Sequence, residues 1–261
     1  MREGNGEFDS LEPLMDELLR TPVDVIVAAS GIVTSRLVAH TRLIPIVMSA
    51  SGVDPVQAGW AESYARPGSN VTGLTLSNDE AIPKLVQLLK EAAPNMKQLG
   101  FLKTRSNTTT TQKIFDIGHT AAVAIGIKTH VGLVEDIGEV EGELERLHQQ
   151  GIDALIVLAD PVIDNFRERI AEAAIERELP TAGQVSFYAD AGFLLTYAPG
   201  LSAIHRRAAI FVDRILRGAR PADLPIERPS KLLFTLNLKT ARRMDLTVSP
   251  TLLSLADEVI E

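Results

Sequence analysis

The sequence contains no cysteine, and this absence excludes disulfide bonds, thiolate metal ligands and a thiol nucleophile together. It also contains no apolar run near the roughly 20 residues that a membrane-spanning helix needs. The amino-terminal residues MREGNGEFDS show neither the basic region nor the apolar region of an export signal. We therefore expect no direct insertion into a membrane and no export signal in this chain.

Known catalytic signatures are absent from the sequence as well. There is no G-x-G-x-x-G, G-x-x-x-x-G-K-[ST], H-E-x-x-H or G-x-S-x-G motif. The five histidines are scattered and do not have the spacing of metal ligands. These absences favour a protein that is not an enzyme and that uses no metal ion and no cofactor, and an enzyme with a Rossmann-like lobe is the remaining alternative.

Basic residues are fewer than acidic residues in this sequence. The chain carries 26 Lys and Arg against 34 Asp and Glu, which gives a formal net charge of −8, and no run of basic residues offsets it. The resulting field opposes the approach of a phosphate backbone, so no nucleic acid is expected as a partner.

What the sequence does contain is a regular alternation of short apolar runs with longer amphipathic stretches. This alternation is typical of parallel strands connected by covering helices, so we predict an α/β fold. At 261 residues the chain is long enough for two lobes. The clearest helices are predicted over 78–92 and 202–218. Nine strands are predicted, at 24–30, 44–50, 71–76, 98–103, 128–134, 153–160, 179–184, 192–198 and 231–237.

One pattern occurs twice along the chain. The run DVIVAAS is followed by a helical stretch and by LIPIV, and DALIVLAD is followed by a helical stretch and by LPTAG. Each copy predicts a strand, a crossover helix and a second strand that is entered through a proline. Two similar half-sheets in one chain are the simplest explanation, and a chance similarity between parallel strands is the alternative.

The loops that follow the strands are the expected place for a binding site, because ligands of open parallel sheets bind at the carboxyl ends of the strands. Ser30 and Gly31 follow the first strand and start a helix, whose unpaired N–H groups and partial positive charge suit an anion such as a carboxylate. Thr34 lies one turn further along, and Ser49 and Ser51 follow the next strand. The alternative is that Ser30 only caps its own helix.

The second half of the chain offers its own candidates. Asp160 stands at the equivalent strand end, where it either pairs with a ligand ammonium group or caps the following helix. Asn107 lies in the polar segment KTRSNTTTTQ, which either binds the ligand or starts a helix. Tyr188 and Tyr197, together with Phe187, are candidates for an aromatic wall, and core packing is the alternative for Phe187.

Taken in order, these loops resemble the substrate-binding proteins of ABC importers, in the branch associated with amino-acid-like and aromatic ligands. The segments that carry the resemblance are PVDVIVAASG, IPIVMSASGVDPVQAGWAESYARPGSNVTGLT, LADPV, AGFLLTYAPGL, RRAAIFVDRILRGARPADLPIERPSK and NLKTARRMDLTVSPTLLSLADEVIE. Together they cover almost the whole chain, and the ARPGSNVTGL stretch and the carboxyl-terminal segment are specific to that family.

The resemblance implies a type I periplasmic-binding-protein fold. In that fold two Rossmann-like lobes with parallel sheets are joined by a hinge and close on a small ligand without chemistry. The implied first lobe is formed by 1–76 and 197–261, and the second by 77–196. The resemblance also implies which lobe supplies each part of the ligand site. The first lobe's wall is expected from Ser30, Gly31, Ser49 and Ser51, and the second lobe and hinge are expected to supply Asn107, Asp160 and Tyr197.

The chain departs from the family pattern in two places. Family members usually begin with an export signal and a further strand, helix and strand, so the first lobe is expected to lack these and to expose an edge of the strand at 24–30. The segment KTRSNTTT stands where the family commonly has an Asn-Pro loop, and this difference leaves the role of Asn107 open.

The resulting hypothesis is a solute-binding component of an ABC import system. It captures a small organic ligand, amino-acid-like or aromatic and bearing a carboxylate, and presents it to the membrane subunits of an ABC permease. The resemblance implies a periplasmic or cell-surface location, although the chain shows no export signal. The alternative, from another class, is an intracellular ligand-sensing or regulatory module with the same fold.

Overall fold

The structure is a computed structural model that describes residues 11–76, 81–105, 109–229 and 231–261. The chain divides into two compact units. Unit 1 consists of Met1–Asn78 and Gly200–Ser230, and unit 2 consists of Asp79–Pro199 and Lys231–Glu261. No helix among the described residues is both long and apolar enough to cross a membrane.

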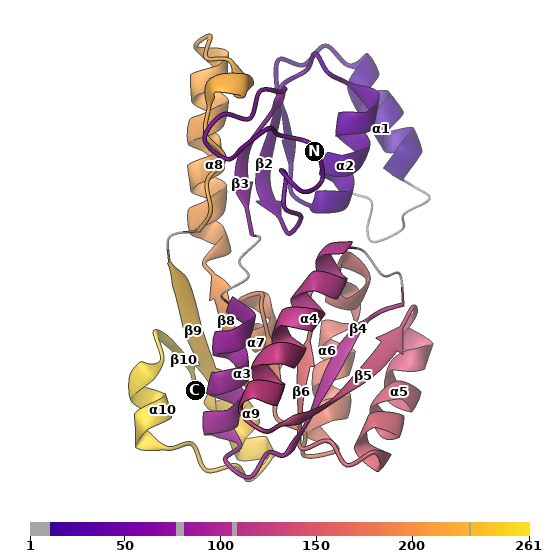
Figure 1. Ribbon diagram of the computed structural model, residues 1–261, viewed down its shortest axis with the longest axis vertical. Coiled ribbons are helices and arrows are strands. Elements are labelled where there is room, and N and C mark those ends of the chain that lie inside the picture. The colour runs from indigo at the N-terminus through magenta and orange to yellow at the C-terminus, as the bar shows by residue number, and fades with distance from the viewer. Residues whose placement is uncertain (1–10, 77–80, 106–108, 230) are drawn as a thin grey trace. The chain divides into compact units, whose positions relative to one another are not determined.

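Unit 1 is built on a parallel sheet of three strands in the order β1-β2-β3. Figure 1 shows α8 on one side of this sheet and α1 and α2 on the other. Val47 packs on one side with Ile204, Ala208 and Phe211 of α8, and Met48 packs on the other with Leu37 of α2. The elements of unit 1 are α1 (Leu11–Arg20), β1 (Ile26–Ala28), α2 (Gly31–His40), β2 (Ile46–Ser51), β3 (Val71–Thr75), α8 (Leu201–Leu216) and a 3-10 turn at Pro221–Asp223.

Unit 2 is built on a sheet of seven strands in the order β10-β9-β8-β7-β6-β4-β5, in which only β8 and β9 run antiparallel. One side of this sheet packs against α3, and the other packs against α5 and α6. The strands are β4 (Gln98–Thr104), β5 (Lys128–Val134), β6 (Ala154–Val157), β7 (Thr181–Gly183), β8 (Leu195–Pro199), β9 (Leu232–Asn237) and β10 (Glu258–Ile260). The helices are α3 (Ala81–Ala92), α4 (Thr109–Ala124), α5 (Ile137–Gln149), α6 (Pro161–Ile175), α7 (Phe187–Asp190), α9 (Leu238–Arg243) and α10 (Pro250–Leu255).

Each of the nine predicted strands corresponds to an observed strand, and the predicted helices at 78–92 and 202–218 correspond to α3 and α8. Strand β10 was not predicted from the sequence. Residues 231–261 were expected in the first lobe, whereas the structure places them in unit 2. The reason is the pairing of β9 with β8, which brings Phe234 opposite Tyr197.

The repeated pattern has the same backbone geometry in both units. In unit 1 the N–H of Ile26 donates to the carbonyl of Pro45 at 2.9 Å, and in unit 2 the N–H of Leu155 donates to the carbonyl of Pro180 at 2.9 Å. Each pair joins two parallel strands connected by one helix. The similarity of DVIVAAS and DALIVLAD therefore reflects two strand-helix-strand motifs with equivalent registers.

The two outer parallel strands, β1 and β5, differ in how their open edges are covered. Among the described residues β1 pairs only with β2, and Val27 is half exposed on this apolar strand. On β5, Glu143 of α5 accepts the N–H of Leu133 at 2.7 Å, and Arg146 donates to the carbonyl of Val131 at 2.7 Å. These two side chains form hydrogen bonds with backbone groups that would otherwise be free to pair with another strand.

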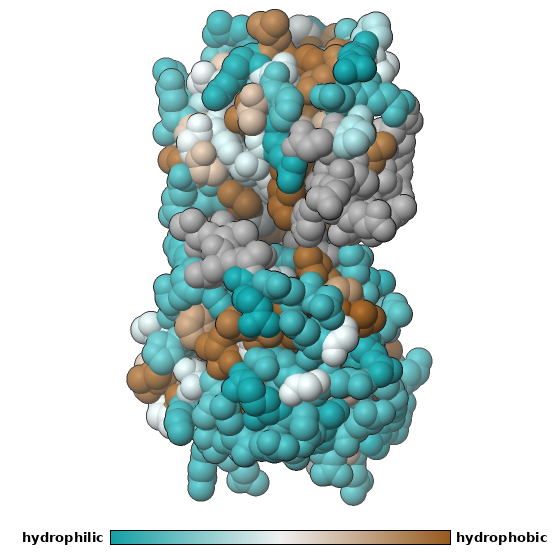
Figure 2. All heavy atoms as spheres, turned by 90° about the vertical axis from the view of Figure 1, so that its right-hand side faces the viewer, coloured by the Kyte–Doolittle hydropathy of each residue, from teal (hydrophilic) through white to brown (hydrophobic). Residues whose placement is uncertain are grey.

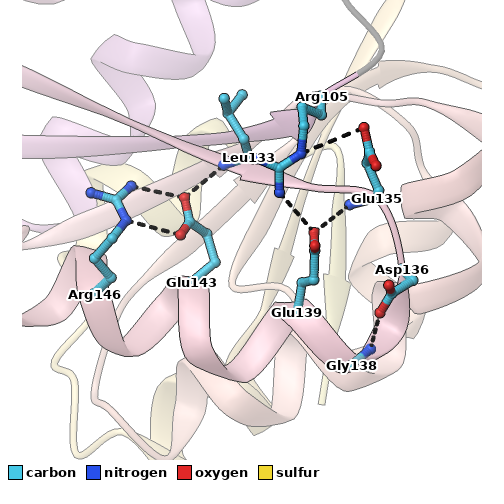
Figure 3. A network of polar contacts seen from close by, with 8 residues as sticks. All are labelled: Arg105, Leu133, Glu135, Asp136, Gly138, Glu139, Glu143 and Arg146. Atoms are coloured by element: carbon cyan, nitrogen blue, oxygen red, sulfur yellow. Dashed lines mark hydrogen bonds and ion pairs between the residues drawn. The ribbon is translucent and has the colours of Figure 1, made fainter.

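Figure 3 shows that this cover continues toward the end of β4, where Arg105 lies between two carboxylates. Arg105 is 3.1 Å from Glu139 and 3.5 Å from Glu135. The Arg146 guanidinium holds the pKa of the Glu143 carboxyl below its usual range, so Glu143 accepts as an anion. The face of unit 2 that carries α5 is mainly hydrophilic in Figure 2, as expected for a solvated face.

Replacing Glu143 with Ala is expected to destabilise unit 2 by about 1–3 kcal/mol, because the N–H of Leu133 and the Arg146 guanidinium both lose a partner. It also reopens the edge of β5, so the fraction of dimer should rise with protein concentration. Chemical denaturation and analytical ultracentrifugation measure the two effects. Glu141→Ala on the same helix breaks only an exposed pair with Arg169 and serves as the control. Equal losses of stability in both variants would show that the hydrogen bonds of Glu143 at the edge of β5 contribute no more than an exposed ion pair.

Candidate functional site

In unit 1 the loop after β1 is held by its own hydroxyl groups. The Ser30 hydroxyl accepts the N–H of Val33 at 3.3 Å and so caps α2. The buried Thr34 hydroxyl donates to the carbonyl of Ser30 at 2.8 Å. Both hydroxyls therefore have structural partners, as the capping alternative predicted for Ser30. The first-turn N–H groups of Gly31 and Ile32 have no hydrogen-bond partner among the described residues.

The loop after β2 packs directly against this helix start. A Cβ placed on Gly31 would lie 2.4 Å from Cγ2 of Val53 and 3.4 Å from the hydroxyl of Ser51, so only glycine allows this approach. Ser51 is fully buried, and its hydroxyl accepts the N–H of Val53 at 3.3 Å. Ser49 is also buried and donates to the carbonyl of Ala28 at 3.4 Å. The structure thus brings the candidates of unit 1 together at one edge of its sheet.

In unit 2 the equivalent helix start carries a buried carboxylate. Asp160 is 8% exposed, and its Oδ1 accepts the N–H of Val162 at 2.9 Å, which caps α6. Its Oδ2 accepts the hydroxyl of Thr104 from the end of β4 at 3.3 Å. Burial raises the pKa of Asp160, and these two hydrogen bonds oppose the rise. Capping and ligand binding are compatible here, because each oxygen can accept a further hydrogen bond.

Asp164, one turn further along α6, is the residue that sequence reasoning missed. Its Oδ1 accepts the hydroxyl of Tyr188 at 2.7 Å. Burial raises the pKa of Asp164 to about 6, and the nearby Asp160 adds to this rise, while the hydrogen bond from Tyr188 opposes it. The spacing of Asp160 and Asp164 was a usable signal, because residues four apart lie on the same face of a helix. The two carboxyl groups form what we call the acidic pair.

Tyr188 holds Asp164 of the acidic pair in place from the core of unit 2. The ring is fully buried in the core between the sheet and α6, and a Cβ at Gly183 would lie 2.3 Å from its Cδ2. Burial, with Asp164 close by, raises the pKa of Tyr188 well above its usual value, so the hydroxyl stays protonated and donates. With no exposed surface, Tyr188 can act on a ligand only by holding Asp164. Phe187 beside it is half-buried and stacks under Arg167, with the guanidinium carbon 5.5 Å from the ring centre.

The remaining candidates lie elsewhere. Tyr197 is half-buried on the opposite side of the sheet, where it packs against the core that contains α3, so the structure does not bring it to the acidic pair. Asn107 lies outside the described residues. Lys103, just before Thr104, is buried and donates to Gln112 at 2.8 Å, and burial lowers its pKa. Among the described residues no group of three or more His, Asp or Glu is placed to hold a metal ion.

Comparison with known proteins identifies the family. The family model for ABC transporter substrate binding proteins matches residues 3–260. The chain belongs to this family. It is similar to a tyrosine-binding protein of Clostridioides difficile, with 22% identity over 251 residues that make up 94% of this chain and 70% of the relative.

Two solved structures have a similar fold. A Streptococcus pneumonia protein described as an ABC domain in complex with L-Trp has a TM-score of 0.87 at 22% identity, with 97% of this chain and 84% of that chain covered. A conserved domain protein of Vibrio cholerae has a TM-score of 0.86 at 24% identity, with 96% and 83% covered. The chain is thus a substrate-binding protein of ABC transporter type with a type I periplasmic-binding-protein fold, as the resemblance implied.

Proposed function

We propose that this protein reversibly binds an aromatic amino acid and presents it to the membrane subunits of an ABC import system, outside the cytoplasm. The observation that carries the proposal is the acidic pair of Asp160 and Asp164 at the carboxyl end of the sheet in unit 2. Two partly desolvated carboxyl groups that retain free lone pairs suit the α-ammonium group of an amino acid.

Unit 1, considered by itself, contains groups that suit the opposite charge of an amino acid. The N–H groups of Gly31 and Ile32 at the start of α2 suit a carboxylate, because they are unpaired among the described residues and stand at the positive end of a helix. The preference for an aromatic side chain is supported by the two relatives, which are described as binding tyrosine and as complexed with L-Trp. The half-buried ring of Phe187 is the candidate wall next to the acidic pair.

The proposal is tested by isothermal titration with L-Trp, L-Tyr and L-Phe, together with two truncated analogues. Indole-3-propionate lacks the ammonium group and tryptamine lacks the carboxylate. At least one aromatic amino acid is expected to bind, and both analogues are expected to bind at least about tenfold more weakly, since each loses a charge-assisted contact. If indole-3-propionate binds as well as L-Trp, the acidic pair has no role in recognition. If no aromatic amino acid binds, the proposed ligand class is wrong.

A further inference from the structure

Unit 1 contains a cavity at the opposite end of the strands from the helix start at Ser30. It has a volume of about 480 Å³ and is lined by Arg42 and by the segments 68–70 and 220–222. These segments surround the amino-terminal end of β3, which begins at Val71, whereas Ser30 follows the carboxyl end of β1. The cavity is therefore separate from the groups that we assign to amino-acid binding.

The charged side chains that line this cavity are both arginines, Arg42 and Arg220. Among the described residues Arg42 makes no ion pair. Arg220 is 77% exposed and uses its Nε and Nη2 atoms for Asp223, at 2.7 Å each, which leaves Nη1 without a partner among the described residues. The residues that line the cavity thus include two arginines and no acidic residue, and the acidic neighbours of this lining include Asp223 at Arg220 and Glu62 at Gly68.

The two arginines stand on loops that are fixed to the same short segment. The side-chain amide of Asn70 donates to the carbonyls of Thr41 and Ile44, at 3.1 and 2.7 Å, and so holds the loop of Arg42. The N–H of Gly68 donates to the carbonyl of Ala222 at 3.2 Å and holds the loop of Arg220. Because both loops are anchored to residues 68–70, little ordering of the backbone is needed when a ligand binds to the arginines.

The charge distribution of the chain favours an anion in unit 1. All eight lysines of the sequence lie in unit 2, and every cationic Lys or Arg side chain of unit 1 is an arginine. Unit 1 has eleven arginines against twelve Asp and Glu, a net charge of −1, which leaves −7 of the total of −8 in unit 2. An anion approaching unit 1 thus meets little net repulsion from that unit. Guanidinium groups are the side chains best suited to bind two oxygens of one oxyanion.

We propose that this cavity binds a phosphate group. The phosphate is either free in solution or part of a phospholipid headgroup, and both sources share the same oxyanion chemistry. A lipid source has one further support, because Leu43, the residue after Arg42, is 91% exposed. An apolar side chain beside a basic site is able to enter the apolar part of a bilayer surface while the arginines bind its headgroups.

The first arm of the test uses inorganic phosphate. Titration in a phosphate-free buffer, followed by isothermal calorimetry, is expected to show binding that weakens about tenfold in Arg42→Gln and again in the double variant with Arg220→Gln. Arg206→Gln is the control, because Arg206 is an exposed arginine near the other end of α8 and outside the cavity. Both arginines of the cavity are exposed, so circular dichroism should show an unchanged fold in every variant.

The second arm uses vesicles of phosphatidylcholine with and without phosphatidylglycerol, and measures co-sedimentation. Binding that requires phosphatidylglycerol, and that falls in both Arg42→Gln and Leu43→Ser, assigns the phosphate to a lipid headgroup. Binding of inorganic phosphate without vesicle binding assigns it to a soluble ligand. The proposal is overturned if neither probe binds, or if binding in either arm survives replacement of both arginines. Neither result depends on whether the protein binds aromatic amino acids.

Discussion

Replacing Asp164 with Asn is expected to raise the melting temperature of unit 2 at pH 7 by roughly 5–10 °C, because the native structure holds this carboxyl group at a cost. Burial raises the pKa of Asp164 from 3.8 to about 6. A difference of about two pKa units corresponds to about 3 kcal/mol of stability that is lost when the group ionises. Asparagine keeps the shape and still accepts the hydrogen bond of Tyr188 but carries no charge.

The sign of this effect fixes its dependence on pH. The native state binds the Asp164 proton more tightly than the unfolded state does, so the favourable contribution is fully present below about pH 4 and is lost as the pH rises to about 6. The gain from Asp164→Asn should therefore vanish near pH 4 and reach its maximum above about pH 7. Melting curves recorded by circular dichroism from pH 4 to pH 8 measure it.

Two further variants separate this effect from a general change of charge. Asp190→Asn removes an exposed carboxylate from the same unit and should change stability by less than about 0.5 kcal/mol. Tyr188→Phe removes the hydroxyl that donates to Asp164, which leaves the carboxyl group less well solvated, so stability at pH 7 should fall. A gain from Asp164→Asn that is equal at pH 4 and pH 8 would show that the carboxyl group is not strained by burial.

Such a cost is expected where a side chain serves binding, because burial of a carboxyl group is unfavourable for folding alone, and the nearby Arg167 offsets this burial only in part. The cation that relieves it would be the ammonium group of the ligand. Ligand binding should then lower the pKa of Asp164 and release a proton near pH 6, so the measured affinity should weaken below that pH. The charge of the Asp164 carboxyl group is thus expected to affect both the stability of unit 2 and the affinity for the ligand.

The strands and their order along the chain could be predicted from the sequence because each is a short apolar run bounded by polar loops. Strand β10 could not, since Glu258–Ile260 has three residues and only two of them are apolar. The placement of 231–261 also could not be predicted. A run such as KLLFTLN shows that a strand forms, but its partner is decided by side-chain packing with β8, which is more than thirty residues away in the sequence.

The candidate site was predictable in part for a similar reason. Ser30 and Asp160 stand out locally, because a small polar residue between an apolar run and a helix has few roles, and the structure shows both as helix caps. Asp164 does not stand out, because its raised pKa comes from burial in the folded unit, and its hydrogen-bond partner Tyr188 is distant along the chain. Tyr188 and Tyr197 look alike in the sequence, yet they lie on opposite sides of the sheet.

Replacing Asp160 with Asn is expected to weaken the binding of an aromatic amino acid by at least about 30-fold, the effect of removing one partner from a buried charge pair. Asparagine is as good a helix cap as aspartate, and its side-chain oxygen still accepts the N–H of Val162. The variant should therefore fold normally, and its loss of affinity reports the charge alone. Isothermal titration at pH 7.5 with the best ligand of the panel measures this loss.

The matched comparison is Asp160→Asn against Asp164→Asn, each titrated with the amino acid and with the analogue that lacks the ammonium group. If the acidic pair binds the ammonium group, both variants lose affinity for the amino acid, and neither weakens the binding of indole-3-propionate, since that ligand has no ammonium group for the pair to hold. An equal loss for both ligands would mean that the variants disturb the helix start of α6 instead of removing a charge. Unchanged affinity for the amino acid in Asp160→Asn would leave Asp160 as a helix cap and exclude it from the ligand site.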